Sequence, residues 1–378
     1  MARNIDRRLQ SLNSRRRGTD RVSRITRDAA QEVLVNSLKA ESYVARAPTQ
    51  RNTRYVLGAM QAVSPDYTRI SIEEAQRVGA QLKTGLAKQA IWVDFRLQGS
   101  VPCDIHIRGV SDVDLLVLDE RYVHYDTSGI RSLRSGYASP VSYDTLQALQ
   151  QLRRESEAIL IAAFPAATVD TTGSKAINLS GGSLRRPVDV VPSNWFDTSD
   201  YQSSGAEADR GVHILNKAVP ERVLNLPFRH IQRIGVRDAQ CRGGMKKAIR
   251  LCKNVKADAI EEGTRIELSS FDLASALWHA DLGALDVGAD RELAILAEAT
   301  RFLDFLARNL PYAATLQVPD GSRTIFNTAV KQEALIRMSL EMDDLALEVS
   351  REQAGLVESS NINSAQIADY LRRAYVPA

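Results

Sequence analysis

The stretch from residue 97 to residue 118, LQGSVPCDIHIRGVSDVDLLVL, constrains the chain more than any other, because it joins a turn to two strand-like segments. Gly99 and Ser100 end an alternating apolar and polar run, and Asp112 and Asp114 open an apolar run twelve residues later. In a strand, residues i and i+2 share a face, so the two carboxylates would project side by side, about 7 Å apart along the backbone. Adjacent carboxylates repel unless a cation lies between them, and oxygen ligands suit Mg²⁺ or Mn²⁺.

A pair of aspartates can also be a strand edge that its charges keep in solution. Asp189 is a third acidic candidate, because it lies in the apolar segment 187–192, where a charge is costly unless a cation or a hydrogen bond meets it. Three carboxylates favour a two-metal site for phosphoryl transfer, with ions about 3.5–4 Å apart. Gly99 would let a phosphate approach the backbone, and the N–H and hydroxyl of Ser100 would hold phosphate oxygens.

Hydrophobic periodicity divides the chain into a mixed half and a helical half. Strands are expected at 91–97, 112–118, 167–171, 174–180 and 187–192, and loops at 120–141 and 196–211. Helices are expected at 22–46, from a capping box at Ser71 onward, and at 142–164, whose apolar end 158–163 is predicted to be buried. From residue 217 onward strand signals vanish, and helices are expected at 237–257, 269–284, 290–309, 326–348 and 363–375. We therefore expect an α+β protein with two lobes and a cleft between them.

Charge and cysteine content exclude several classes of protein. The net formal charge is only +3, but residues 1–30 carry nine arginines against three aspartates. Such a segment binds an acidic surface, stays solvated or packs as a helix, and the apolar residues between 22 and 33 favour packing. The spacing of Cys103, Cys241 and Cys252 supports neither a disulfide framework nor a zinc site. Without a signal peptide or an apolar run of about 18 residues, a cytoplasmic protein is expected.

The order of these motifs resembles the polymerase-β-like nucleotidyltransferase superfamily, and within it the cGAS/DncV-like nucleotidyltransferases, or CD-NTases. The resemblance rests on Gly99-Ser100, on Asp112-Val113-Asp114 and on Val188-Asp189-Val190 in a separate strand. It implies a nucleotidyltransferase core of mixed sheet and helices over 46–215, a C-terminal helical bundle over 216–378 and a central cleft. Residues 1–45 would form a basic N-terminal segment and helix.

The C-terminal half extends the resemblance. Residues 248–254, AIRLCKN, resemble a helix of the family, which puts Lys253 at the position of a lysine that contacts nucleotide phosphates. Ser270 and Phe271 resemble a polar–aromatic pair, so that Ser270 would contact phosphate and Phe271 would stack on a base. From the residues alone, Lys253 could be a solvated helix residue and Phe271 a core residue. The segment 101–105 departs from the small, threonine-containing segment of relatives, and the zinc ligands of animal cGAS are absent.

The resemblance implies an enzyme that condenses ATP and/or GTP into a cyclic oligonucleotide with release of pyrophosphate. A cyclic dinucleotide second messenger for bacterial anti-phage (CBASS) defence is the first expectation. Asp112, Asp114 and Asp189 would hold two Mg²⁺ or Mn²⁺ ions, and Asp189 would also take the proton of the attacking hydroxyl. The implied partners are the NTP substrates and a downstream effector that the cyclic nucleotide activates. A ligase that conjugates the C-terminus is a further candidate partner, with a frayed terminus as the alternative.

Two other functions are compatible with the same residues. A linear or RNA-end nucleotidyltransferase would use the arginine-rich start to grip RNA, so nucleic-acid binding is left open. A scaffold that binds nucleotides without catalysis would retain the fold, although the presence of all three aspartates argues against it.

Overall fold

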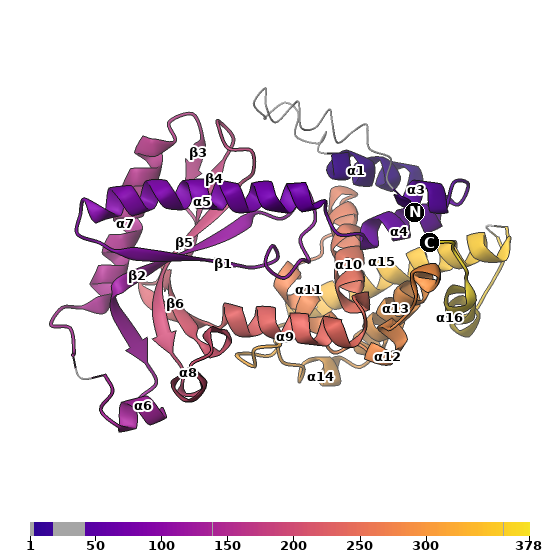
Figure 1. Ribbon diagram of the computed structural model, residues 1–378. Coiled ribbons are helices and arrows are strands. Elements are labelled where there is room, and N and C mark those ends of the chain that lie inside the picture. The colour runs from indigo at the N-terminus through magenta and orange to yellow at the C-terminus, as the bar shows by residue number, and fades with distance from the viewer. Residues whose placement is uncertain (1–3, 18–41, 138, 358) are drawn as a thin grey trace.

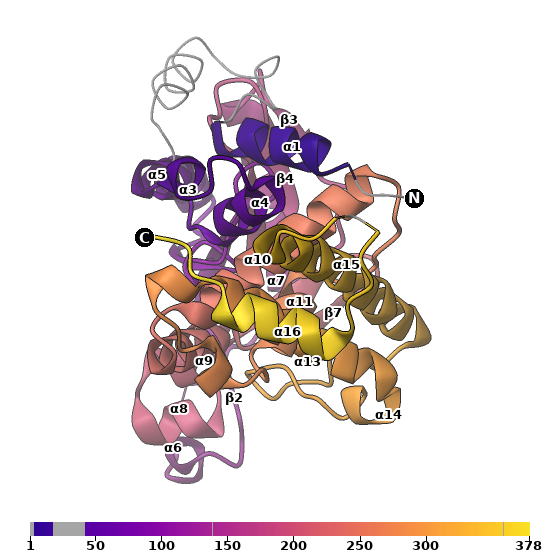
Figure 2. The same cartoon turned by 90° about the vertical axis from the view of Figure 1, so that its right-hand side faces the viewer.

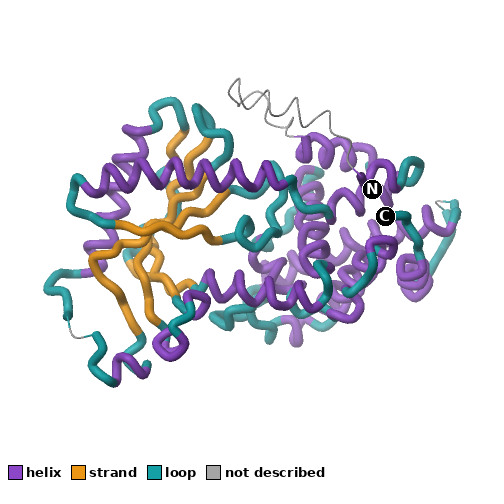
Figure 3. The backbone as a smooth tube through the Cα atoms, viewed as in Figure 1, coloured by secondary structure: helices purple, strands orange, loops and turns teal. Residues whose placement is uncertain are grey.

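The computed structural model describes residues 4–17, 42–137, 139–357 and 359–378. It places a strand-rich half beside a helix-rich half (Figures 1 and 3), which confirms the expected α+β fold. Each half has its own apolar core. One cluster lies between the sheet and its helices, and a larger one lies among the helices of the C-terminal half.

The described residues form one mixed sheet with the order β1-β2-β5-β4-β3, to which β6 adds on β5 and β7 on β6. Strands β2 and β5 are parallel, and the other pairs are antiparallel. The strands are β1 (Val93–Gln98), β2 (Val113–Tyr125), β3 (Thr168–Asp170), β4 (Ile177–Ser180), β5 (Val188–Asp197), β6 (Gly211–Asn216) and β7 (Glu221–Asn225). The strand-like segments on either side of the Gly99 turn are thus β1 and β2, paired directly with each other.

Two helices cover one face of the sheet, α5 (Pro65–Ala87) and α7 (Thr145–Ala163). The predicted start of α5 at Ser71 is wrong. Ser64 caps the helix by accepting from the N–H of Tyr67, and Pro65 follows at a position where its missing N–H costs nothing. Burial of the whole segment 158–163 is also wrong, because α7 turns only one side to the sheet and Ile161 is 55% exposed.

Three further differences arise where pairing or packing overrides local composition. β2 continues through residues 120–125, which were expected to be a loop, since β5 pairs with it as far as Tyr125. Two short helices form in segments that were expected to be loops. α6 (Ile130–Leu133) lies in the rest of segment 120–141, and α8 (Ser199–Ser204) lies in segment 196–211. Strands do not vanish at residue 217, because β7 pairs along β6 at an edge of the sheet.

The C-terminal half is built around α10, which contacts α4, α9, α11, α13 and α15. Its elements are α9 (Pro227–Gln240), α10 (Gly244–Glu261), α11 (Ser270–Leu277), α12 (Leu282–Leu285), α13 (Leu293–Arg308), α14 (Leu310–Ala313), α15 (Ala329–Ala354) and α16 (Ser364–Arg373). Of the described helices, none has the length and apolarity that crossing a membrane requires.

The helices of the N-terminal region, α1 (Ile5–Arg17), α3 (Ser42–Arg46) and α4 (Arg51–Met60), pack on this helical half (Figure 2). The helix predicted at 22–46 lies outside the described residues except for α3. The division at residues 45 and 215 stays a prediction, although apolar packing groups these three helices with the C-terminal ones.

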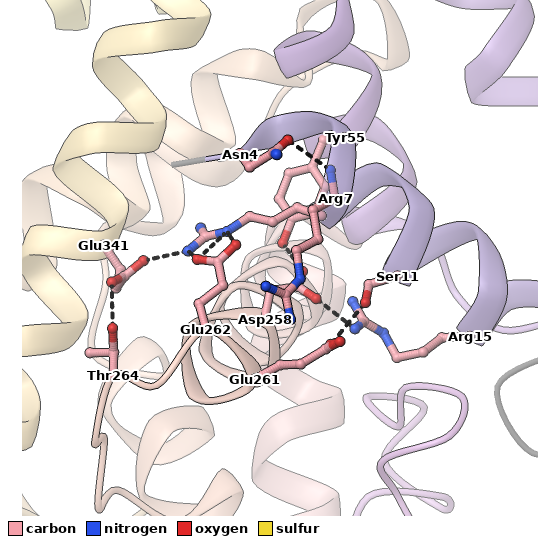
Figure 4. A network of polar contacts seen from close by, with 11 residues as sticks. Asn4, Arg7, Ser11, Arg15, Tyr55, Asp258, Glu261, Glu262, Thr264 and Glu341 are labelled. Carbon is pink, nitrogen blue, oxygen red and sulfur yellow. Dashed lines mark hydrogen bonds and ion pairs between the residues drawn. The ribbon is translucent and has the colours of Figure 1, made fainter. Parts of the chain in front are cut away.

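Arginines of α1 make buried ion pairs with the helical half (Figure 4). The Arg8 side chain donates to Glu262 at 3.0 Å and to Glu341 at 2.9 Å. Arg15 donates to Asp258 at 2.6 Å, and the hydroxyl of Tyr55 donates to the other oxygen of the same carboxylate. Arg8 and Arg15 therefore anchor α1 to α10 and α15, and this role belongs to the fold.

Candidate active site

Four polar residues lie directly opposite one another across four strands. Gln98 on β1 is paired with Asp114 on β2, Asp114 with Asp189 on β5, and Asp189 with Asn178 on β4. Residues opposite each other on neighbouring strands face the same side of the sheet. Two carboxylates therefore occupy the middle of a row that a carboxamide flanks at either end.

Asp112 reaches this row from the residue before β2. The side-chain amide of Asn178 lies 2.8 Å from Asp189 Oδ1 and 3.5 Å from Asp112 Oδ2. Burial and then the charges of Asp189 and Asp112 raise the pKa of Asp114 to about 7. Burial also raises the pKa of Asp189, and the hydrogen bond from Asn178 opposes that change. The three aspartates predicted from their spacing are thus close enough to repel one another.

The donor set suits a divalent cation. Three carboxylates supply only oxygen ligands, and the repulsion that raises the pKa of Asp114 is a cost that a bound cation would remove. Within the described part of the chain, no three His, Cys, Asp or Glu side chains are arranged so that they could already hold a metal ion. The three carboxylates therefore match a divalent cation in the type of ligand atom and in charge. The ligands of such a cation would come from the row across the sheet.

Gly99 is required next to Asp114 for two reasons. Its φ is +77°, a left-handed conformation that favours glycine, and a Cβ there would lie 2.1 Å from Asp114 Oδ2. Directly after it, the carbonyl of Ser100 accepts from the N–H of Ile105 at 3.1 Å, which closes the turn. The turn thereby places the backbone of residues 99 and 100 against a carboxylate of the row.

A cavity of about 280 Å³ lies beside the row, between the sheet and the helices α9, α10 and α11. Six of the residues predicted for the site line it together, namely Gly99, Ser100, Asp114, Lys253, Ser270 and Phe271. Asp112 and Asp189 lie outside its wall. The sequence did not single out Gln98, Asn225 or His230, which also line it. Asn225 is the last residue of β7, a strand that the sequence did not predict, and its amide donates to Gln98 Oε1 at 3.0 Å. Only the pairing of β7 could therefore have revealed Asn225 as a site residue.

Lys253 is buried and bonded to the connection between the Gly-Ser turn and Asp112. Its ammonium donates to the carbonyl of Ile105 at 2.8 Å and to the hydroxyl of Ser111 at 3.2 Å. Burial, together with the nearby Lys256, lowers the pKa of Lys253 to about 7. Arg250, one turn earlier on α10, donates to the carbonyl of Asp104 at 2.7 Å. α10 therefore holds the connection at several points, and the solvated alternative for Lys253 is wrong.

Phe271 forms an aromatic wall of the cavity. It follows Ser270, the first residue of α11, and Ser269 caps that helix by accepting from the N–H of Asp272. The ring of Phe271 lies 4.5 Å from that of His230, centroid to centroid, and is only partly buried. The guanidinium of Arg323 also lies over the ring of Phe271, 5.3 Å from its centroid, so a planar group that stacks on Phe271 would meet this cation as well.

Comparisons with known proteins show that the chain is similar in sequence to cyclic dinucleotide synthases. No family model matches the chain. A protein from Yersinia aleksiciae named cyclic dinucleotide synthase CdnE is 41% identical over 92% of this chain and 93% of its own length. A c-di-GMP synthase from Capnocytophaga granulosa is 32% identical, over 75% of this chain and 83% of that protein.

Solved structures give the same outcome for the fold. The chain superposes on a STING-associated CdnE c-di-GMP synthase from Capnocytophaga granulosa with a TM-score of 0.69 and 27% identity, over 94% of this chain and 100% of that one. The corresponding enzyme from Flavobacteriaceae sp. has a TM-score of 0.73 at 22% identity, with the same coverage. The second likeness concerns the fold alone.

Proposed function

This chain belongs to the cGAS/DncV-like nucleotidyltransferases (CD-NTases), and we propose that it joins two purine nucleoside triphosphates into a cyclic dinucleotide. The observation that carries the proposal is the row of carboxylates that meets the Gly99 turn at the edge of a cavity with an aromatic wall. GTP is the first candidate for both positions, since several relatives of known name are c-di-GMP synthases.

The cavity would hold the donor triphosphate. Phe271 would stack on the base, while the Ser100 and Ser270 hydroxyls and the backbone at Gly99 would bind phosphate oxygens. Lys253 would add positive charge at the wall. Its two hydrogen bonds indicate that it also acts by fixing the connection that leads into Asp112.

The carboxylates would carry the reacting centre. Asp112, Asp114 and Asp189 would hold two Mg²⁺ or Mn²⁺ ions, which neutralise phosphate charge and increase the acidity of the attacking hydroxyl. The acceptor ribose hydroxyl attacks the α-phosphorus, the new P–O bond replaces the bond to pyrophosphate, and the hydroxyl proton passes to a carboxylate oxygen of Asp189. The linear dinucleotide then turns in the cleft, and the same displacement at its own triphosphate closes the ring.

The test is incubation with all four NTPs and Mg²⁺ or Mn²⁺, followed by nuclease digestion and mass spectrometry of the product. We expect a phosphatase-resistant cyclic dinucleotide that forms without RNA. The double variant Asp112→Asn, Asp114→Asn should lose at least about 10³-fold in rate, with an unchanged far-UV circular dichroism spectrum. A linear product, a requirement for RNA or a wild-type rate in the double variant would contradict the proposal.

The product defines the partner. A cyclic dinucleotide that is released into solution acts through an effector that binds it, which fits a second messenger in anti-phage defence. Conjugation through the C-terminus stays a prediction. The structure holds residues near that end against the helical half, since the Val376 N–H donates to Asp290 and Val376 is buried.

A further inference from the structure

We propose that Asn178 is a positioning residue of the carboxylate site, whose side-chain amide sets the spacing of Asp189 and Asp112 for a divalent cation. The inference rests on the proposed function only in that the cation serves the reaction. It adds to that function a residue from β4, a strand that carries none of the predicted site residues.

The geometry of β4 aims Asn178 at the site. Asn178 is paired with Asp189, while Ile177 and Leu179 on either side are fully buried in the core of the sheet. Side chains alternate between the two faces of a strand, so these apolar neighbours hold Asn178 on the opposite face. Asp114 and Asp189 lie on that face too, because they are in register with Asn178.

The amide group suits two carboxylates at once. An asparagine amide carries two hydrogens, and the nitrogen of Asn178 lies 2.8 Å from Asp189 Oδ1 and 3.5 Å from Asp112 Oδ2. One donor therefore links a carboxylate of β5 with the carboxylate that directly precedes β2 and offsets part of their repulsion. It brings no positive charge of its own, so it does not compete with a cation as a lysine would.

Removing the amide should weaken cation binding before it affects the fold. Groups that orient metal ligands typically change metal affinity by about 10–100-fold when they are lost. We therefore expect Asn178→Ala to weaken Mn²⁺ binding to the nucleotide-free protein about 10-fold, as measured by electron paramagnetic resonance of free Mn²⁺. The Mg²⁺ concentration for half-maximal activity should rise by a similar factor, and excess Mg²⁺ should restore most of kcat.

A second variant and a control separate positioning from a general loss of structure. Asn178→Leu keeps the approximate size without the donor and should match Asn178→Ala. Asn216→Ala removes an amide from the same sheet, one that bonds Glu221 at 3.0 Å, and should leave Mn²⁺ binding unchanged. Mn²⁺ affinity within twofold of wild type in both Asn178 variants would overturn the inference, as would a lower kcat that excess Mg²⁺ fails to restore. If Mn²⁺ binding weakens while the wild type makes no cyclic product, the inference stands and the proposed function fails.

Discussion

At the scale of single residues, the site combines groups that are unfavourable for the fold. Asp114 lies partly buried beside two other carboxylates, and the turn that faces it favours glycine at position 99, where φ is +77°. A carboxyl whose pKa is raised in the folded state is penalised when it ionises. The penalty is absent below the ordinary value of 3.8 and is fully present above about 7.

This penalty predicts that Asp114→Asn stabilises the protein in the absence of metal. At pH 8 in EDTA, the free energy of unfolding should rise by about 1–2 kcal/mol, a value reduced from the full shift because the carboxylate is partly solvated. At pH 5 the gain should shrink, since the wild-type carboxyl is then mostly protonated.

Urea unfolding at the two pH values measures the difference. Glu120→Gln, an exposed carboxylate on the same strand, serves as the control and should change stability by less than about 0.5 kcal/mol. Equal stability of Asp114→Asn and wild type at pH 8 would show that the carboxylates do not repel as described.

At the scale of elements, α10 connects the two halves. The middle of the helix bonds the connection 104–111 through Arg250 and Lys253, and its C-terminal part receives Arg15 of α1 at Asp258. Helix α1, which carries Arg15, therefore stabilises α10, the same helix that positions the site.

The pair of Arg15 with Asp258 should be one of the most sensitive points of the helical half. Both side chains are largely buried, so among the described residues Arg15→Met leaves Asp258 with the Tyr55 hydroxyl as its side-chain partner. Breaking such a pair from one side costs about 3–5 kcal/mol. We expect a loss of about 3 kcal/mol in urea unfolding.

An exposed ion pair of the same helix α1 supplies the control. Arg51 and Asp6 join α4 to α1, but both side chains are about 60% exposed, so Arg51→Met should cost less than about 1 kcal/mol. Similar losses in the two variants would mean that burial of the Arg15 pair contributes nothing.

At the scale of the whole molecule, buried and half-buried histidines limit stability in acid. Burial lowers the pKa of His106, His124, His213 and His230 to about 4. The unfolded chain binds protons at these groups near pH 6.5 and the folded one does not, so stability is intact above pH 6.5 and falls as the pH drops toward 4.

We therefore expect the free energy of unfolding to fall by more than about 3 kcal/mol between pH 7 and pH 4.5. Urea midpoints at half-unit steps measure the slope. The double variant His106→Gln, His230→Gln should flatten it by roughly half, even if it lowers stability at pH 7. A midpoint that stays constant down to pH 5 would contradict the assignment.

Much of this architecture could be predicted from the sequence, because local patterns carried it. Alternation marked β1, and the Gly-Ser turn with the D-x-D motif marked the start of β2. β7 was missed since it is short and largely exposed, and it exists through pairing with β6. Strand pairing also explains why three polar residues of the site were missed, namely Gln98, Asn178 and Asn225. Nothing in their own segments distinguishes them, and they join the site only through register across strands.

The parallel pairing of β2 with β5 has a consequence for synthesis of the protein. The two strands meet only after the long crossover through α7, β3 and β4 has been made, and contacts between distant segments form late in folding. A ribosome-bound fragment that ends before Val188 therefore has Asp112 and Asp114 but no third carboxylate beside them. Because the proposed mechanism needs all three aspartates, we expect chains that stop before Val188 to make no cyclic product.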